Sequence, residues 1–294
     1  MRIALAWPHA LLALAIVIVW GTNFAVTKIA LNDFPPLFVA ALRFFFSLFP
    51  AILFLPRPAV SWRNLAGYGL LIGVVQFGFL YYAMERFISP GLASLVVQMQ
   101  VFFTIGLAIA IDGEKVRLFQ WSALVLAALG LGIIIFHASG DASPLGVLLV
   151  LLASAGWSGG NQVGRSAGSG INMLAYVVWA SLFAVPLLLI ASLTVDGWPA
   201  IAADIRAARP ADWLSIGWQA GNTLFGYGCW AWLMARYPAA TVAPLSLLVP
   251  VFGFATSAIM LGEPLPPWKL EAAALVIGGL ALNMLWPRLR QISA

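Results

Sequence analysis

Hydrophobic runs of about twenty residues, separated by short polar breaks, fill this chain. A helix needs about 20 apolar residues to cross the hydrocarbon core of a bilayer. Proline, glycine and charged residues mark the breaks, as at 32–36 and 56–58. The pattern predicts an all-α integral membrane protein with ten transmembrane helices, at roughly 8–30, 36–55, 64–84, 90–111, 117–136, 144–166, 171–193, 212–234, 239–261 and 267–287.

Composition supports lipid as the main environment. The chain is 63% hydrophobic and 9% charged, whereas soluble domains have about 25% charged residues. Its net charge of +5 comes from basic residues scattered through short loops, so nucleic acid is not expected as a partner. A single cysteine, Cys229, excludes a disulfide within the chain and a cysteine metal cluster. We expect no metal and no cofactor.

The distribution of Lys and Arg predicts the orientation in the membrane, because these residues are enriched in cytoplasmic loops. With the N-terminus inside, nine of the 15 basic residues fall on the cytoplasmic side. Both termini are therefore expected in the cytoplasm. The nine are Arg2, Arg57, Arg63, Lys115, Arg117, Arg165, Arg236, Arg288 and Arg290.

The two halves of the chain resemble each other. Trp20 and Lys28 align with Trp157 and Arg165 at one common offset. Five spans per half would turn the second half upside down, which gives an inverted repeat with halves at 1–137 and 138–294. The alternative is chance coincidence of common residues in an apolar chain. Further matches in order are Pro50 with Pro186, Met84-x-Arg86 with Met234-x-Arg236, and Gly113-Glu114 with Gly262-Glu263.

Amide side chains within the predicted spans are candidate site residues. Asn and Gln are costly in lipid and normally turn inward. They can line a polar cavity, or they can act as interhelical hydrogen-bond pairs worth about 0.6 kcal/mol each. Asn23 and Asn161 favour the cavity, because they recur at the same depth of the two halves. Gln76, Gln98 and Asn222 are central in other spans.

Several tryptophans lie too deep for the aromatic belt at the membrane interface. They can face lipid as filler, or they can line a cavity that suits apolar side chains. We expect a central, uncharged substrate cavity between the halves. Its predicted lining residues are Trp20, Asn23, Gln76, Tyr82, Gln98, Trp157, Asn161, Trp179, Asn222, Tyr227 and Ser246.

Proline and glycine mark places where helices bend or approach. Pro244 and Pro250 lie inside the ninth predicted span, where each removes a backbone donor. They can expose carbonyls to a cavity or simply curve a packed helix. Pro90-Gly91 is a candidate hinge at the start of the fourth span. The sequence 156–160, a Gly-x-x-x-Gly motif, predicts close helix packing within the bundle.

Charged residues are nearly missing from the span centres. No Asp or Glu lies there, which argues against proton antiport through a buried acid. Arg43, some seven residues into the second span, is expected to extend outward and pair with Asp33 or an interfacial lipid. A gate or a carboxylate-binding role is the alternative. Neither His9 nor His137 is deep and no acids pair, so we expect no enzyme.

The motifs resemble the drug/metabolite transporter superfamily and its ten-helix EamA branch. They are Trp20-Gly-Thr-Asn23-Phe24, Leu42-Arg43-Phe44 and Ala243-Pro244-Leu245. The segments 91–100 and 243–250 are similar to bacterial cysteine and O-acetylserine exporters, and more broadly to amino-acid exporters that include the aromatic one. Small multidrug members use a glutamate in the first helix, and this chain has none there.

This resemblance implies a ten-helix bundle around a central cavity that opens alternately to the two sides. It implies a multi-pass exporter of the bacterial inner membrane for small neutral amino acids or related metabolites. The runner-up is a nucleotide-sugar or multidrug exporter, although a nucleotide sugar should need several cavity-facing Lys or Arg. The expected partners are a small-molecule solute and the lipid bilayer, and we expect a monomer.

Overall fold

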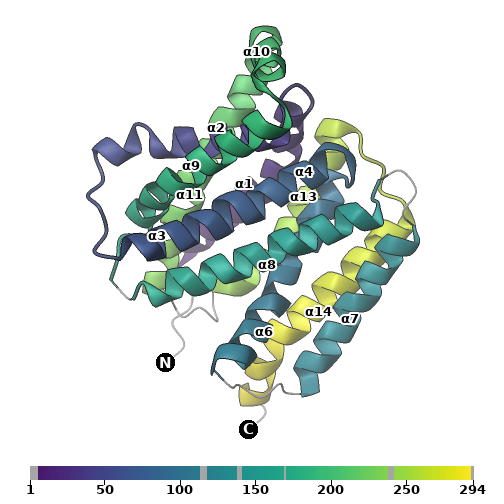
Figure 1. Cartoon of the computed structure of the whole chain (residues 1–294). Coiled ribbons are helices and arrows are strands. Elements are labelled where there is room, and N and C mark those ends of the chain that lie inside the picture. The colour runs from purple at the N-terminus through teal and green to yellow at the C-terminus, as the bar shows by residue number, and fades with distance from the viewer. Residues whose placement is uncertain (1–5, 113–117, 138–140, 169, 238–241, 293–294) are drawn as a thin grey trace.

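The fold consists of packed helices. The computed structural model describes residues 6–112, 118–137, 141–168, 170–237 and 242–292. Helices account for nearly all of these residues (Figure 1), and the described part of the chain has no strand beyond one isolated bridge between Ile88 and Ala142. The all-helical prediction is therefore confirmed. The predicted match of Gly113-Glu114 with Gly262-Glu263 begins outside the described residues.

The first half runs through α7. Its helices are α1 (Trp7–Leu31), α2 (Pro36–Leu48), η1 (Ala51–Leu53), α3 (Trp62–Tyr68), η2 (Gly69–Gly78), α4 (Phe79–Arg86), α5 (Pro90–Val96), η3 (Val97–Met99), α6 (Gln100–Asp112) and α7 (Leu118–Phe136). The second half contains α8 (Pro144–Ser166), α9 (Met173–Val195), α10 (Trp198–Ala207), α11 (Pro210–Arg236), η4 (Ala243–Leu248), α13 (Val249–Leu261) and α14 (Pro267–Ile292).

Local sequence explains where many of these helices begin and end. The helices α2, α5, α8, α11 and α14 each begin at a proline, whose fixed φ and missing N–H suit the first helical turn. Helix α13 ends at Leu261, and the next residue, Gly262, adopts φ 67°. Glycine accepts this left-handed conformation without a Cβ clash.

Within the described residues, eight helical segments are long and apolar enough to cross a membrane. They are Trp7–Leu31, Pro36–Leu53, Trp62–Arg86, Pro90–Leu107, Leu118–Phe136, Pro144–Ser166, Met173–Val195 and Pro267–Trp286. A ninth apolar segment, Leu245–Leu261, is shorter. Helix α11 has 27 residues but is not among the eight. The count of ten spans therefore stays a prediction.

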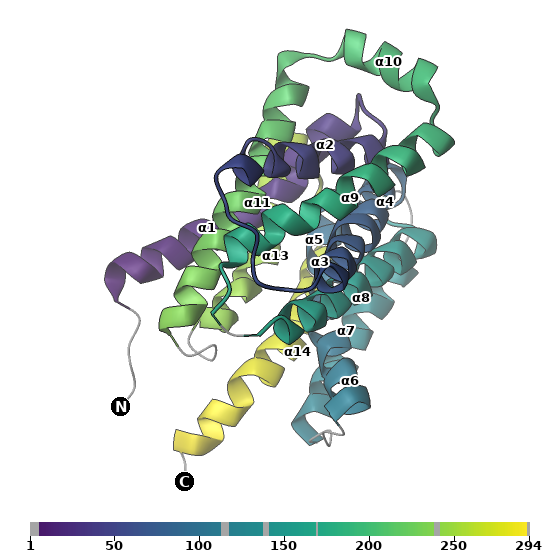
Figure 2. The same ribbon diagram turned by 60° about the vertical axis from the view of Figure 1, so that its left-hand side comes forward.

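The first helix of each half packs against the other half. Helix α1 contacts α11 and α13, which are the third and fourth spans of the second half. Helix α8 contacts η2 and α4 in the third span of the first half, and α6 in the fourth. Three further pairs join equivalent helices: α2 with α9, α5 with α13, and α7 with α14. Figure 1 shows α7 and α14 side by side at one edge, and in Figure 2 helix α10 lies at the end of the molecule opposite the C-terminal end of α14.

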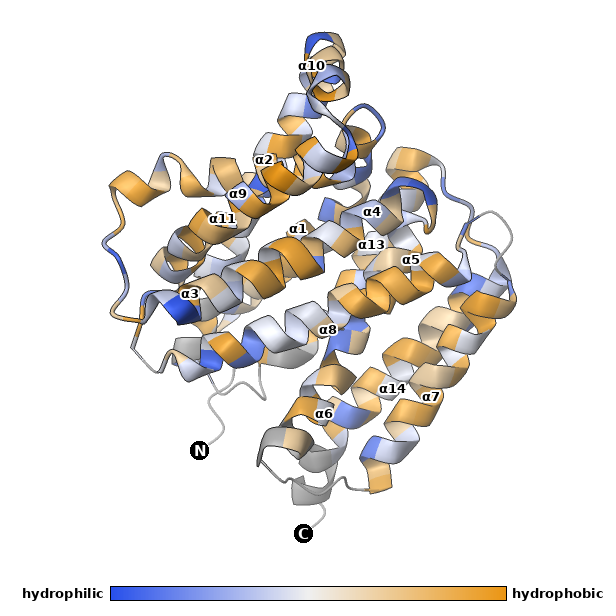
Figure 3. Ribbon diagram, in the orientation of Figure 1, coloured by the Kyte–Doolittle hydropathy of each residue, from blue (hydrophilic) through white to orange (hydrophobic). Residues whose placement is uncertain are grey.

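Glycines allow the closest crossings. A Cβ at Gly160 would lie 2.4 Å from Ile72 Cδ1, and one at Gly156 would lie 2.7 Å from Val75 Cγ1. The Gly-x-x-x-Gly face of α8 therefore packs on η2 inside the bundle, which confirms the predicted close packing. Hydrophobic residues predominate along helices such as α7 and α9 (Figure 3), and large hydrophobic side chains on them, such as Leu129 and Ile190, are more than half exposed at the outer surface. Such a surface suits lipid.

Four predicted spans are not continuous α-helices. In the second span, α2 ends at Leu48 and the short 3₁₀ helix η1 follows at Ala51–Leu53. In the third span, η2 winds as a π-helix. In the fourth, a 3₁₀ turn at η3 separates α5 from α6. In the ninth, the 3₁₀ segment η4 precedes α13. Such interruptions change the direction of the side chains beyond them.

Candidate functional site

The interface between α1 and α11 brings two predicted amides to the same depth. A Cβ at Gly226 would lie 2.2 Å from Trp20 Nε1, and Ser215 donates to the carbonyl of Val26 at 2.5 Å. Asn23 lies between these contacts on α1. On α11, Asn222 shares a helical face with Ser215 and Gly226. The two amides therefore face the same interface.

Neither amide is fully hydrogen-bonded. Asn23 is 7% exposed and Asn222 is 5% exposed. Asn23 donates to the Thr27 hydroxyl at 3.4 Å. The carbonyl oxygens of both, together with Gln76 Oε1, are buried without a hydrogen-bond partner among the described residues. A buried orphan acceptor costs about 1–3 kcal/mol, so these oxygens are available to a polar solute.

Arg43 is buried in the bundle, and the prediction that it extends outward is wrong. Its side chain is 3% exposed. Nε donates to the Thr223 hydroxyl at 2.9 Å, and Nη1 donates to the Tyr81 hydroxyl at 2.7 Å. The guanidinium carbon lies 4.0 Å from the centre of the Phe77 ring. These neighbours from α11, α4 and η2 hold it inside, so the interior is not uncharged as expected.

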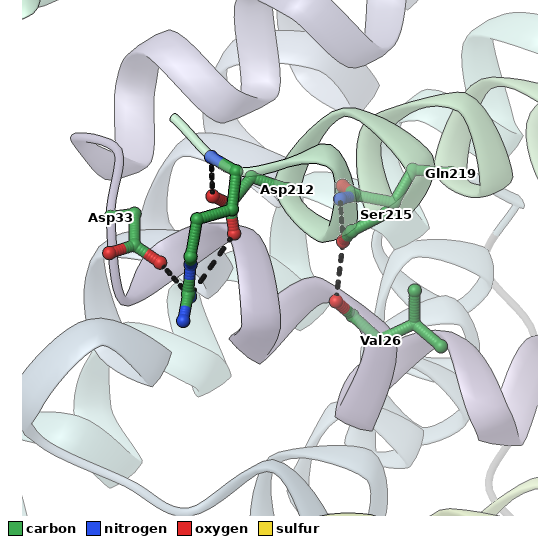
Figure 4. Close-up of polar contacts among 6 residues, drawn as sticks. Val26, Asp33, Asp212, Ser215 and Gln219 are labelled. Atoms are coloured by element: carbon green, nitrogen blue, oxygen red, sulfur yellow. Dashed lines mark hydrogen bonds and ion pairs between the residues drawn. The ribbon is translucent and has the colours of Figure 1, made fainter. Parts of the chain in front are cut away.

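A chain of hydrogen bonds continues from Arg43 to α1. The Tyr81 hydroxyl donates to Gln219 Oε1 at 2.7 Å. Gln219 Nε2 donates to the Ser215 hydroxyl at 3.3 Å, which in turn donates to Val26. Figure 4 shows the Gln219–Ser215–Val26 part of this chain. The network fixes the side chains of α2, α4, α11 and α1 relative to one another.

Asp33, the predicted partner of Arg43, pairs instead with Arg209. Arg209 also contacts Asp212, whose carboxylate accepts from the Arg209 main-chain N–H at 2.8 Å. The hydrogen bond to Asp212 and the charge of Asp33 raise the pKa of the Arg209 guanidinium. Figure 4 shows Asp33 and Asp212 within this cluster, apart from Ser215 and Gln219. The turn after α1 is thus joined to the start of α11.

The remaining predicted cavity residues lie in different surroundings. Gln76 and Gln98 are buried. Trp157, Asn161, Tyr227 and Ser246 are half-buried, and the Tyr227 ring lies 6.4 Å from that of Trp20. Trp179 donates to the carbonyl of Leu55, in the turn between α2 and α3, and packs against Trp62. It therefore belongs to one end of the bundle.

Tyr82 does not belong to the buried interior. It is 40% exposed and its ring packs beside Phe87, whereas the adjacent Tyr81 is 1% exposed. Successive helical residues point about 100° apart, so only one of the two tyrosines can face Arg43. The predicted cavity position of Tyr82 is therefore wrong, and Tyr81 takes that place.

The predicted hinge residues lie at helix starts. Pro90 and Gly91 begin α5, where both are buried. Pro244 falls in η4, and the buried Pro250 falls in the first turn of α13. The backbone thus breaks at 243–249, near the predicted bend. Whether these positions move remains a prediction.

A pocket of about 330 Å³ opens at one end of the bundle, away from the predicted cavity. Pro90 lines it, and none of the other predicted residues that the structure describes does. Lys28, one of the residues that line the pocket, donates to the carbonyls of Met84 and Glu85. The lining is Lys28, Asn32, Met84, Glu85, Arg86, Ile88, Ser89, Pro90, Asp141, Leu261 and Glu263.

Beside this pocket, Lys269 forms the most buried ion-pair cluster of the described chain. Its side chain is fully buried, and Nζ lies 2.8 Å from Asp141 and 2.9 Å from Glu263. Glu263 also accepts from Ser89 and from the main-chain N–H of Gly91. These contacts join the starts of α5 and α14 to the end of α13. Within the described residues, no group of His, Cys, Asp and Glu could hold a metal ion.

Sequence reasoning missed Tyr81 and Thr223, the polar partners of Arg43, and also Gln219, which accepts from Tyr81. The prediction named Tyr82 and not the adjacent Tyr81. On α11, however, Ser215, Gln219 and Asn222 recur at helical spacing, and this polar stripe in an apolar chain could have identified the face.

Comparison with known proteins agrees with this architecture. The model of the EamA-like transporter family matches twice, at residues 7–136 and 144–285. The chain is 38% identical to a probable amino-acid metabolite efflux pump of Salmonella typhimurium, over 95% of this chain and 96% of that protein. A protein of the same description from Escherichia coli K12 is also 38% identical, with the same coverage.

More distant relatives extend the comparison. The uncharacterized inner membrane transporter YedA of Escherichia coli K12 is 28% identical, over 89% of this chain and 85% of that protein. A solved crystal structure shares the fold with a TM-score of 0.64 at 17% identity, covering 95% of this chain and 99% of its own. The matches are to transporters and not to enzymes. Since the family model spans both halves of the sequence, the chain belongs to the EamA-like transporter family.

Proposed function

We propose that this protein exports small neutral amino acids or related metabolites across the bacterial inner membrane, by alternating access to an interior site. Two relatives with 38% identity are described as probable amino-acid metabolite efflux pumps, and a more distant one is described as an inner membrane transporter. In this proposal the solute is small, because it must fit within one interior site between the two halves.

The observation that carries the proposal is the set of buried amide oxygens without partners. Amides that only join helices would be paired with each other. Here Asn23, Gln76 and Asn222 each keep an unsatisfied oxygen in the interior. An ammonium group has three donors and no acceptor, so it satisfies such oxygens. Half-buried rings such as Trp157 offer apolar surface to a side chain.

The exchanged packing of the two halves supports alternating access. Helix α1 packs on the second half, and α8 packs on the first half. A tilt of either half would therefore carry the first helix of the other half with it. We propose inverted halves at 1–137 and 138–294, with both termini in the cytoplasm, acting as a monomer. The 330 Å³ pocket beside Lys28 would then lie on the periplasmic side.

Uptake into liposomes that contain the purified protein tests the proposal. A panel of labelled neutral amino acids is offered, with a cationic dye and a nucleotide sugar beside them. Amino-acid flux should exceed both. Asn23→Ala and Trp157→Ala should each reduce it with folded yield unchanged. Trp121→Ala is the control, since this side chain of α7 is 54% exposed on the outer surface.

Two results would count against the proposal. A wild type that carries the dye or the nucleotide sugar and no amino acid would favour the runner-up activity. Unchanged flux in both Asn23→Ala and Trp157→Ala would remove the site assignment.

A further inference from the structure

Arg43 is a charge without a counterion in the bundle interior. It is the eighth residue of α2, about 10 Å along the helix from Pro36. Among the described residues no carboxylate lies within ion-pairing distance of it. Its polar neighbours, Tyr81 and Thr223, are neutral hydroxyls. A buried guanidinium is costly unless a negative group compensates it.

The guanidinium also keeps unused donors. Arginine carries five N–H donors in a planar fork that matches a carboxylate. Nε and Nη1 each donate to one hydroxyl, while Nη2 makes no hydrogen bond with any residue that the structure describes. The ring of Phe77 covers one face of the group at 4.0 Å. The guanidinium is therefore held in place, and its Nη2 donors are left without an acceptor among the described residues.

Amide oxygens without hydrogen-bond partners belong to residues that are next in sequence to the contacts of Arg43. Asn222 precedes Thr223 and Gln76 precedes Phe77 in sequence, so their backbones are one residue from two side chains that touch Arg43. Both have an unpaired buried oxygen. Asn23, on α1, which packs against α11, has a third unpaired buried oxygen. The interior thus combines cationic donors with neutral acceptors.

We propose that Arg43 binds the carboxylate of the transported amino acid, while the amide oxygens of Asn23, Gln76 and Asn222 receive its ammonium group. This inference rests on the proposed export of amino acids and defines the substrate class more narrowly. The substrate needs a free carboxylate, and an amine or a carboxamide of the same size binds poorly. Tyr81 and Thr223 are positioning residues that orient the fork.

A purely structural role for Arg43 makes a different prediction. If Arg43 only tied α2 to α4 and α11, its loss would lower the flux of every substrate by a similar factor. A carboxylate-binding role lowers the flux of the amino acid selectively. The ratio of amino-acid flux to carboxamide flux therefore separates the two roles.

The experiment measures flux into liposomes of one transported amino acid, its carboxamide and its decarboxylated amine. Wild type should prefer the amino acid by more than about tenfold, since a hydrogen bond to a charged group contributes about 1.5–3 kcal/mol. In Arg43→Gln, the flux of the amino acid should be close to that of its carboxamide and of its amine, so that each ratio approaches one. Arg43→Lys keeps the charge without the fork and should give an intermediate ratio.

Controls use residues of the same type. Arg57→Gln removes an exposed arginine that also stacks on an aromatic ring, 4.3 Å from the centre of Trp62, and should leave the ratio unchanged. Tyr81→Phe should lower the ratio. Tyr82→Phe, one residue along and exposed, should not.

The outcomes separate this inference from the function on which it rests. If wild type carries no amino acid, the proposed function fails. If wild type carries amino acids and amines equally, or Arg43→Gln keeps the preference, the export function stands and the carboxylate assignment is overturned. Should Arg43→Gln not fold as a monodisperse protein, Arg43→Lys and Tyr81→Phe decide, and full preference in both overturns it.

Discussion

Asp33, in the turn after α1, pairs with Arg209 at the start of α11 and not with Arg43 in α2. Arg43 stays inside the bundle, where its only polar partners among the described residues are the hydroxyls of Tyr81 and Thr223. The pairing with Arg209 places the acidic partner at a helix end, where the Arg209 side chain is 60% exposed and the Asp33 side chain is 37% exposed.

Asp33→Asn should have little effect on stability. Exposed ion pairs contribute about 0–1 kcal/mol because water screens them. We expect the thermal midpoint of the purified protein in detergent to change by no more than a few degrees. Amino-acid flux should be unaffected, since Asp33 does not contact Arg43. A loss of flux comparable to that of Arg43→Gln would show that the two residues are coupled.

Gly279→Ala should destabilise the α7–α14 pair, whereas Gly278→Ala should not. A Cβ at Gly279 would lie 2.6 Å from the carbonyl oxygen of Ala123, and nothing lies within 4 Å of one at Gly278. Forcing an extra methyl group into packed backbone costs about 1–3 kcal/mol. Thermal unfolding of the two variants in the same detergent checks this. Equal midpoints would contradict the observed crossing.

Lys269→Ala should destabilise the protein much more than Arg86→Ala. Removing one member of a buried ion pair costs roughly 3–5 kcal/mol, because the partners stay buried and unpaired. Lys269 is fully buried between Asp141 and Glu263, whereas the Arg86 side chain is 75% exposed beside Glu85. Partial exposure of Asp141, at 32%, places the expected cost at the lower end. Chemical unfolding in detergent compares the two variants.

Flux of a neutral amino acid should not need an imposed pH gradient. In the described helices the buried acids, Asp212 and Glu263, lie at helix ends. None is placed to carry a proton at mid-depth, as proton-coupled carriers require. The measurement is uptake into liposomes at equal internal and external pH, with and without a proton ionophore. Uptake that appears only when a pH gradient is imposed would refute the prediction.

The helical architecture was predictable because lipid imposes a simple rule on the sequence. Each span must be apolar over about 20 residues, so runs and breaks mark the elements directly. The close packing of α8 was predictable for a similar reason, since Gly156 and Gly160 leave a smooth face. Fold class and family therefore followed from local patterns.

The site was less predictable, because it depends on where helices from distant parts of the chain meet. From Arg43 alone, the sequence could not indicate that Thr223, 180 positions away, would draw the side chain inward. Tyr82 was predicted without weighing Tyr81, and α-helical spacing from Gln76 could not have separated the two, because η2 winds as a π-helix. The burial of Asn23 and Asn222 did agree with an inward-facing role.

The winding of Gly69–Gly78 has a mechanical consequence for the third span. Its backbone bonds reach five residues instead of four, so a change to α-helical winding would turn α4 about its own axis relative to α3. Neither flanking helix would need to unfold. Tyr81 would swing away from Arg43 while α3 kept its place against α8. The winding of this short segment thus sets the direction in which Tyr81 leaves the third span to meet the buried arginine.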